Sequence, residues 1–312
     1  MRAHRIGIIG LGKIAQDQHI PVIRANPAFE LVAVASQRGL AVAGVAHAVR
    51  DYRELLDGAV ALDAVAICTP PQIRHRIARE ALEAGKHVLL EKPPAATTSE
   101  LVDLGRVAAS LGRTLFTTWH SQYNRAVDEA RRALVGQSVR RMAITWKEDV
   151  RKWHPGQRWI WQAGGFGVFD PGINALSIMT AILPEPAFVR HADLQVPANA
   201  EAPIAADIAF ASGLVEADMR ATLDWRQAGP QTWDIAIETA AGARLDLSQG
   251  GSRLAIDGRT VVDEAPAEYQ GIYRRFDGLL RAGQSVVDEA PLRLVADAFM
   301  LGRRQTVDPF TD

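Results

Sequence analysis

Cysteine is nearly absent from this chain, since Cys68 is the single one among 312 residues. It has no partner for an intramolecular disulfide, which agrees with a reducing cytoplasm. No apolar run approaches the ~20 residues of a membrane-spanning helix, so we expect neither a membrane span nor export. Charge of one sign is not in excess, because 35 basic and 36 acidic residues leave a formal net charge of −1. Such a chain has no global field for collecting nucleic acid or anionic membranes, and small-molecule partners are expected.

The first 118 residues alternate between short apolar runs and helical patterns. The predicted strands are Ile6–Ile9, Leu31–Ala35, Ala64–Cys68, His87–Leu90 and Thr114–Thr117. The predicted helices are Gln18–Ala25, Tyr52–Leu56, Gln72–Ala84 and Ser99–Leu111, the last with Thr97, Thr98 or Ser99 as its cap. This alternation predicts a doubly wound, mostly parallel α/β sheet over residues 1–120, with helices on both faces.

Beyond residue 120 the pattern changes to longer strands. They are predicted at Arg141–Glu148, Ile204–Ala211, Leu214–Thr222, Trp233–Thr239 and Ala243–Leu247, with turns at Gly250-Gly251 and Asp257-Gly258. We therefore predict a second, α+β domain over residues 121–312, with a mainly antiparallel open sheet and helices on one face. No flexible linker separates the halves, so close packing around one cleft is expected. The outer face of the second sheet is either covered core or the contact of a possible homodimer.

A glycine-rich turn follows the first predicted strand. Gly10, Gly12 and Ala15 form the Gly-x-Gly-x-x-Ala pattern between a strand and a helix, where the backbone approaches a pyrophosphate at a helix N-terminus. This arrangement predicts a Rossmann dinucleotide site. The ribose is read at the end of the second strand, and Glu30 lies at the wrong end of that strand. The predicted cofactor residues are Gly10, Gly12, Lys13, Ile14, Ser36, Gln37, Arg38, Thr69, Pro70, Pro71, Glu91 and Lys92.

The residues at that strand end favour NADP. A carboxylate there would bind the free 2′-hydroxyl of NAD and repel a 2′-phosphate, whereas this chain has Ser36 and Arg38. The alternative is that Arg38 is a solvated turn residue and NAD binds equally well. We predict NADP as the cofactor, with NAD accepted less well.

A second motif, Glu91-Lys92-Pro93, directly follows the apolar run that ends at Leu90. Ligands of open α/β sheets bind at the carboxyl ends of the strands. The proline stiffens the turn and can support a cis peptide, so the Lys92 ammonium would be aimed by a fixed backbone. The alternative is an ordinary surface lysine before a turn.

Together, the glycine turn and the Glu-Lys-Pro motif resemble the Gfo/Idh/MocA oxidoreductase family, and the resemblance covers the whole chain. The segments 146–157 and 165–177 resemble its L-arabinose/D-galactose 1-dehydrogenase branch. This resemblance implies that Lys92, Asp170 and Asn174 are catalytic. It also implies that the sugar is bound by His120, Glu148, His154 and Trp233. Trp153 is predicted as a further sugar contact, since it lies in a polar segment beside His154 and an indole face suits a sugar ring. Arg74 departs from the family, since many relatives have histidine there and His75 follows one position late, so neither is assigned a catalytic role.

Asn174 stands where the family usually has histidine. Because asparagine takes up no proton near neutral pH, we predict that Asp170 accepts the proton, Asn174 orients the hydroxyl and Lys92 stabilises the oxyanion. The alternative for Asp170 is a helix N-cap beside Pro171. The expected reaction is NADP-linked oxidation of L-arabinose or D-galactose at the anomeric carbon to the lactone, without a metal. Rival functions are another sugar or inositol oxidoreductase of the family, or a non-catalytic sugar- and nucleotide-sensing regulator.

Overall fold

The computed structural model describes residues 2–213 and 215–311, and the chain divides into two compact units. Unit 1 comprises Met1–Trp119 and Tyr269–Glu289, and unit 2 comprises His120–Glu268 and Ala290–Asp312. The predicted boundary at residue 120 agrees with the first division. The prediction gave all later residues to the second domain, but Tyr269–Glu289 belongs to unit 1. The reason is packing: Phe276 of this segment stacks on Phe29 and Phe116, which are both in unit 1.

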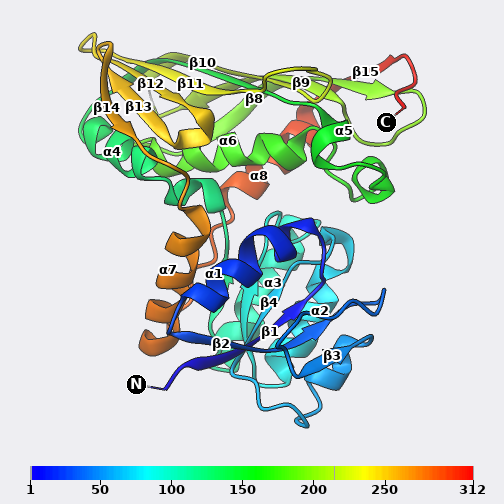
Figure 1. Ribbon diagram of the computed structural model, residues 1–312. Helices are drawn as coiled ribbons and strands as arrows, with labels where there is room; N and C mark the ends of the chain where they lie inside the picture. The colour runs from blue at the N-terminus through cyan, green and yellow to red at the C-terminus, as the bar shows by residue number, and fades with distance from the viewer. Residues whose placement is uncertain (1, 214, 312) are drawn as a thin grey trace. The chain divides into compact units, whose positions relative to one another are not determined.

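Unit 1 is built on a six-stranded parallel sheet with the order β3-β2-β1-β4-β5-β6 (Figure 1). This order is that of a Rossmann dinucleotide-binding fold. Its strands are β1 (His4–Ile9), β2 (Phe29–Ala35), β3 (His47–Val49), β4 (Ala64–Ile67), β5 (His87–Leu90) and β6 (Leu115–Thr117). Strand β4 is buried throughout, as expected for a parallel strand covered on both faces. The sequence analysis missed β3, which has only three residues, none of them buried.

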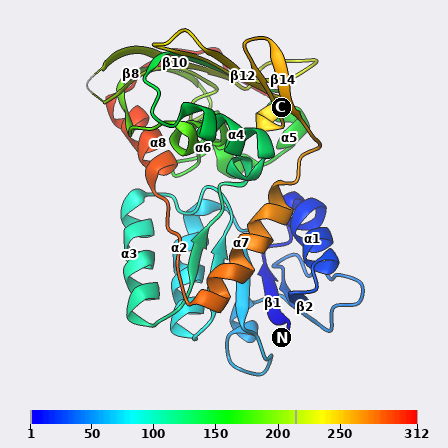
Figure 2. The same cartoon turned by 90° about the vertical axis from the view of Figure 1, so that its left-hand side faces the viewer.

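All helical elements of unit 1 except the last, which was not predicted, agree with the predicted ones to within a few residues. They are η1 (Ala15–His19, a π-helix), α1 (Ile20–Ala25), η2 (Tyr52–Leu55), α2 (Pro71–Glu83), α3 (Thr98–Ser110) and α7 (Glu268–Ala282). Thr97 is the N-cap of α3 and forms a capping box with Glu100. The last helix, α7, lies beside α1 although the two are far apart in the sequence (Figures 1 and 2).

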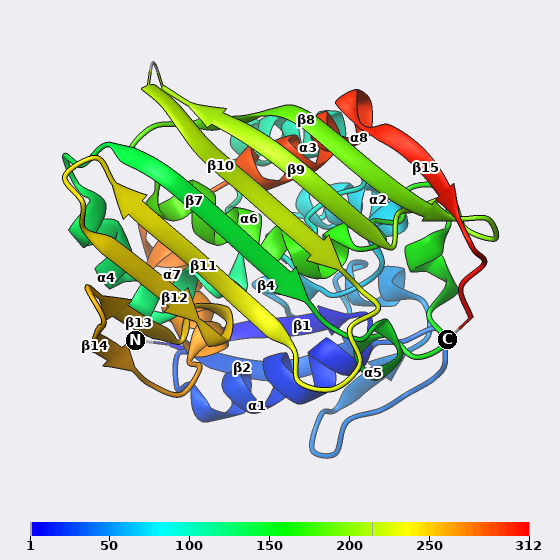
Figure 3. The same cartoon turned by 90° about the horizontal axis from the view of Figure 1, so that it is seen from above.

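Unit 2 contains a nine-stranded sheet with the order β14-β13-β12-β11-β7-β10-β9-β8-β15 (Figure 3). Its strands are β7 (Val139–Lys147), β8 (Ala187–Pro197), β9 (Ala205–Ser212), β10 (Val215–Asp224), β11 (Thr232–Thr239), β12 (Arg244–Ser248), β13 (Arg253–Ile256), β14 (Arg259–Asp263) and β15 (Arg303–Val307). Most pairs are antiparallel, as predicted, but β7 pairs in parallel with β10, and β15 with β8. Residue 214, the predicted start of the third strand, lies outside the described residues.

The helices of unit 2 gather on one face of this sheet, with α4, α6 and α8 along it (Figure 1). The helical elements are η3 (His120–Tyr123), α4 (Arg125–Leu134), α5 (Val150–Trp153), η4 (Arg158–Trp161), α6 (Phe169–Ile182), η5 (Gln249–Gly251) and α8 (Ala290–Leu301). The opposite face bears charged and polar side chains, including an Asp218–Arg220 ion pair and a hydrogen bond from Thr222 to Asp207. It is therefore not a covered apolar core, and dimerisation through it stays a prediction. No helix among the described residues is long and apolar enough to cross a membrane.

Candidate active site

The glycine turn lies where β1 ends, and its backbone leaves room for a ligand. Gly10 has φ +96°, a conformation that side chains disfavour, and a Cβ on it would come within 3.0 Å of the Thr69 backbone nitrogen. A Cβ on Gly12 would meet no atom within 4 Å. Helical structure follows from Ala15, with Ile14 already in a helical conformation. The Lys13 ammonium pairs with the Asp17 carboxylate one turn later, so the described contact of Lys13 is with the helix itself.

The predicted ribose-reading residues follow the last residue of β2. Ser36 is buried and donates its backbone N–H to the Val49 carbonyl. Gln37 and Arg38 are exposed, and the Arg38 guanidinium donates to the Leu11 carbonyl at 3.1 Å, within the glycine turn. Arg38 is thus exposed, with its guanidinium bound to the glycine turn. Glu30 lies near the opposite end of β2, as the sequence indicated.

The loop after β4 contains a buried hydroxyl, that of Thr69, without a hydrogen-bond partner among the described residues. Pro70 is the N-cap residue of α2 and Pro71 is the first residue of that helix. The Thr69 hydroxyl oxygen is buried and has no hydrogen-bond partner among the described residues. A buried hydroxyl without a hydrogen-bond partner lowers stability by its desolvation free energy, unless a bound ligand forms the missing hydrogen bond. Together with the open space over Gly12, this hydroxyl fits a bound dinucleotide.

The Lys92 turn begins directly after β5. The Lys92–Pro93 peptide bond is cis, the isomer that the sequence was expected to allow. Glu91 is buried and its Oε2 accepts the Lys92 backbone N–H at 2.5 Å. Arg74, which was assigned no catalytic role, is also buried and donates to the carbonyl oxygens of Glu91 and Pro93. The sequence signal for this contact was only the departure from histidine at that position.

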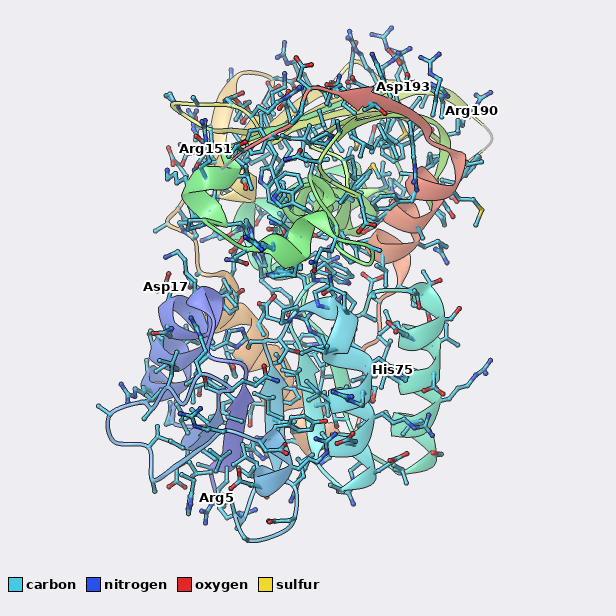
Figure 4. The ribbon with its side chains drawn as sticks, turned by 90° about the vertical axis from the view of Figure 1, so that its right-hand side faces the viewer. Arg5, Asp17, His75, Arg151, Arg190 and Asp193 are labelled. Carbon is cyan, nitrogen blue, oxygen red and sulfur yellow. The ribbon has the colours of Figure 1, made fainter. Side chains whose placement is uncertain are left out.

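His75 has a different environment from its neighbour Arg74. It extends from α2 toward α3, where its Nε2 lies 2.8 Å from the Asp103 carboxylate (Figure 4). Arg79 of α2 donates to the same oxygen of Asp103. This ion cluster joins two helices of unit 1 and explains His75 as a helix-pairing residue.

In unit 2, Asp170 and Asn174 share a helix as predicted. Asp170 is 3% exposed and is the second residue of α6. The N-cap residue of that helix is Val168, which makes no side-chain capping bond, so Asp170 is not the N-cap that the alternative interpretation required. His154 instead lies 3.1 Å from the Asp170 carboxylate through its Nε2. The sequence analysis named His154 as a sugar contact but did not pair it with Asp170, because the two are far apart along the chain.

Glu148 is the acceptor at the centre of a tryptophan cluster. It is buried, and its two carboxylate oxygens accept the indole N–H groups of Trp225 at 3.1 Å and Trp233 at 2.9 Å. Trp153 packs against Trp233, and the His154 ring packs edge-on against Trp225 with ring centroids 5.2 Å apart. The sequence analysis missed Trp225 because nothing local distinguishes it from a core tryptophan. Three of the predicted sugar residues are therefore joined to the His154–Asp170 pair in one cluster.

His120, another predicted sugar residue of unit 2, is paired with a carboxylate. The His120 ring is held at Nδ1 by Glu268 at 2.9 Å. Burial alone would raise the pKa of Glu268, but His120 and hydrogen bonds from Ser121 and Asn124 hold that pKa below its ordinary value. Glu268 is thus a fixed carboxylate that orients His120.

A cavity of about 740 Å³ is lined by residues that include Arg151, Pro155, Arg158, Trp161, Asn199 and Phe310.

Sequence and structure comparisons identify relatives of this chain and of its fold. The model of the Gfo/Idh/MocA oxidoreductase family with an NAD-binding Rossmann fold matches residues 4–119. A galactose 1-dehydrogenase from Pseudomonas fluorescens is 48% identical over the full length of both chains. The crystal structure of a D-galactose-1-dehydrogenase from Rhizobium etli covers 100% of this chain and 99% of its own, with a TM-score of 0.93 and 52% identity. A 3-ketoreductase from Actinomadura kijaniata, solved with NADP, has the same fold at 21% identity, a TM-score of 0.87, and coverage of 98% of this chain and 100% of its own.

Proposed function

Because the chain belongs to the Gfo/Idh/MocA family of oxidoreductases, we propose that it oxidises an aldose, D-galactose or L-arabinose, at the anomeric carbon to the aldonolactone, with NADP preferred as the oxidant. The observation that carries this proposal is the pair of His154 with the buried Asp170, beside Glu148 and its two indoles. Indole faces suit the apolar face of a sugar ring, and a carboxylate can share a pair of sugar hydroxyls. The full-length similarity to two galactose 1-dehydrogenases supports the same substrate class.

The cofactor would be bound by the glycine turn, Arg38 and the Thr69 hydroxyl. When bound, the nicotinamide supplies an acceptor for the hydride of the anomeric C–H bond. Every other requirement of the reaction rests on side chains of this chain. As the hydride leaves, the anomeric hydroxyl must release its proton so that the C–O bond becomes the carbonyl of the lactone.

We assign the release of that proton to Asp170 and the stabilisation of the developing oxyanion to the Lys92 ammonium. Asn174, four residues after Asp170 on α6, would orient the hydroxyl. The His154 imidazole lies beside Asp170, so it is placed to accept the proton from that carboxyl group. A carboxylate is a weak base for a simple alcohol. An anomeric hydroxyl is more acidic because the ring oxygen withdraws electron density, so oxidation at this carbon suits the site.

The deciding experiment mixes the protein with NADP and a panel of D-galactose, L-arabinose, D-glucose and myo-inositol, and follows absorbance of the reduced nicotinamide. Galactose and arabinose share the configuration of the pyranose ring, so we expect both to be oxidised and the lactone to form. If only myo-inositol is oxidised, the hydride is taken from an ordinary ring carbon and not from an anomeric carbon. Sugar binding without any absorbance change would favour a sensing regulator.

Cofactor preference gives a separate prediction. The double substitution Ser36→Asp with Arg38→Ala should shift preference from NADP toward NAD, because it installs an acceptor for the ribose hydroxyls and removes the cation that would pair with a 2′-phosphate. The measurement is the ratio of kcat/KM for the two cofactors with D-galactose saturating. An unchanged ratio would mean that another segment reads the ribose.

Glu148→Gln should raise the KM for D-galactose by about 10- to 100-fold, the size expected for one charge-assisted hydrogen bond. The amide has one acceptor oxygen for two indole N–H donors, so it cannot satisfy both and also accept from a sugar hydroxyl. The KM for NADP should stay near the parental value. Glu129→Gln, on α4 where the carboxylate pairs with Arg132, is the matched control. Equal KM values for D-galactose in the parent and Glu148→Gln would reduce Glu148 to a support for the indoles.

A further inference from the structure

We propose that Arg74 and Tyr269 are positioning residues that hold the turn carrying Lys92, through two separate sets of hydrogen bonds within unit 1. The inference rests on the proposed catalytic role of Lys92. Neither residue carries chemistry of its own in the reaction. Arg74 binds backbone carbonyls on both sides of the lysine, and Tyr269 binds the carboxylate that accepts the lysine's backbone N–H, so together they determine where the ammonium can reach.

Arg74 holds the carbonyl oxygens of the turn. Its side chain is buried, and its Nη1 donates to the carbonyls of both Glu91 and Pro93, the residues that flank Lys92. Its Nη2 donates to the carbonyl of Thr69, at the start of the cofactor loop. A planar guanidinium can serve three carbonyls in different directions, whereas a lysine ammonium on a flexible stem cannot hold the same geometry. Arg74 therefore ties the Lys92 turn to the loop that would bind the cofactor.

Tyr269 holds the same turn through the Glu91 carboxylate. Glu91 is 2% exposed, and its Oε2 accepts the Lys92 backbone N–H. Its Oε1 accepts the Tyr269 hydroxyl at 2.5 Å. Because bonds on both oxygens fix the rotation of the carboxylate, the direction of the Lys92 N–H is fixed with it. A change at Tyr269 would thus be transmitted to the lysine backbone through one shared side chain.

A buried histidine completes this network. The His19 Nε2 lies 3.3 Å from Glu91 Oε1, and its Nδ1 lies 2.8 Å from the Tyr273 hydroxyl. Burial alone would lower the pKa of His19, but Cys68, Tyr273 and Glu91 raise that pKa well above its ordinary value. Burial also raises the pKa of Tyr273 to about 12, so its hydroxyl stays protonated. The His19 ring thus lies beside the Glu91 carboxylate that accepts the Lys92 N–H and the Tyr269 O–H.

Both tyrosines of the network come from α7, the segment of unit 1 that the sequence analysis assigned to the other domain. Tyr269 and Tyr273 are one helical turn apart on its buried face. They pack edge-on against the His19 ring, with centroids 5.0 and 5.8 Å away. The return of α7 therefore supplies hydrogen bonds to the strand end beside Lys92 as well as apolar packing. The residues next to the Glu-Lys-Pro motif in the sequence could not have predicted these hydrogen bonds, because Tyr269 lies 178 positions after Glu91.

The test is Tyr269→Phe, which removes one oxygen and keeps the ring. Since small displacements of reacting groups cost up to about 100-fold in rate, we expect kcat to fall about 10- to 100-fold, with KM for NADP and D-galactose within about twofold of the parent. The matched control is Tyr52→Phe, which removes a hydroxyl that bonds Glu80 at 2.8 Å. It should leave kcat at the parental value. Equal kcat in Tyr269→Phe and the parent would overturn the proposal.

A double-mutant cycle with Lys92→Met separates positioning from general stability. If Tyr269 acts through Lys92, Tyr269→Phe should lower kcat little further in the Lys92→Met background. A full additional loss there would overturn the proposal, because the tyrosine would then act elsewhere. Near-parental turnover of Lys92→Met alone would refute the proposed function instead. Should Tyr269→Phe not fold, as judged by its thermal transition, Arg74→Lys takes its place in the same cycle with the same expected outcomes.

Discussion

Lys92→Met should lose about 100- to 1,000-fold in turnover, the cost of removing one group that stabilises a developing oxyanion, while NADP binding is largely kept. Methionine matches the length and apolar stem of lysine but has no charge and donates no hydrogen bond. The backbone contacts of the turn, from Glu91 and Arg74, involve main-chain atoms that the substitution leaves in place. The effect should therefore appear in kcat, with the fold and the cofactor affinity retained.

Single-turnover kinetics with D-galactose and a titration of NADP binding measure the two effects separately. Lys86→Met is a suitable control because it makes the same chemical change at the opposite end of β5, where the Lys86 ammonium donates to the Leu62 carbonyl. A turnover within a few-fold of the parent would show that Lys92 has no catalytic role. In that case the lysine would be a solvated residue of the turn, as the alternative interpretation of the sequence held.

Asp170→Asn should slow the proton-transfer step by about 10²- to 10⁴-fold, the range for loss of a general base. The substitution keeps the size of the side chain and removes its basicity. Helix α6 should be preserved, since its N-cap residue is Val168 and asparagine keeps the size of the replaced side chain. NADP and sugar should still bind. His154 would lose the carboxylate 3.1 Å from its Nε2, so the pair is disrupted as a unit.

Asn174→Ala is the informative comparison for Asp170→Asn, because it removes only the orientation of the hydroxyl and should cost less. Rates for both variants with L-arabinose should be compared across pH. If Asp170→Asn oxidises L-arabinose at a near-normal rate above neutral pH, the proton leaves by another route. That route would pass through Lys92 in its neutral form or directly to water, and His154 would be the next residue to replace.

Much of unit 1 could be predicted because its signals are local. Alternation of buried runs with amphipathic stretches is set by the repeat of each element, so β1, β2, β4, β5 and β6 were found close to their observed bounds. The cap at Thr97 and the turns at Gly250 and Gly258 depend on a few neighbouring residues. Short or exposed strands such as β3 have no such repeat and were missed.

The candidate site was predicted as a set of residues but not as a set of contacts. The Glu-Lys-Pro turn, Asp170 and Glu148 could be named because each belongs to a short pattern in the sequence. Nothing in those patterns indicated that Asp170 pairs with His154, or that Glu148 accepts from Trp225. The N-cap interpretation of Asp170 was wrong because α6 begins at Phe169, two residues earlier than that interpretation required.

The sequence by itself determined the class of fold, the glycine turn and the chemistry available at each strand end, because these depend on residue type and local spacing. Only the tertiary structure decided which polar groups meet. Tyr269 reaches Glu91 across 178 positions of the chain, and Asp170 meets His154 from a different element. Such pairs form when elements pack their apolar faces together, and their buried polar groups must then find partners among whatever side chains that packing brings near.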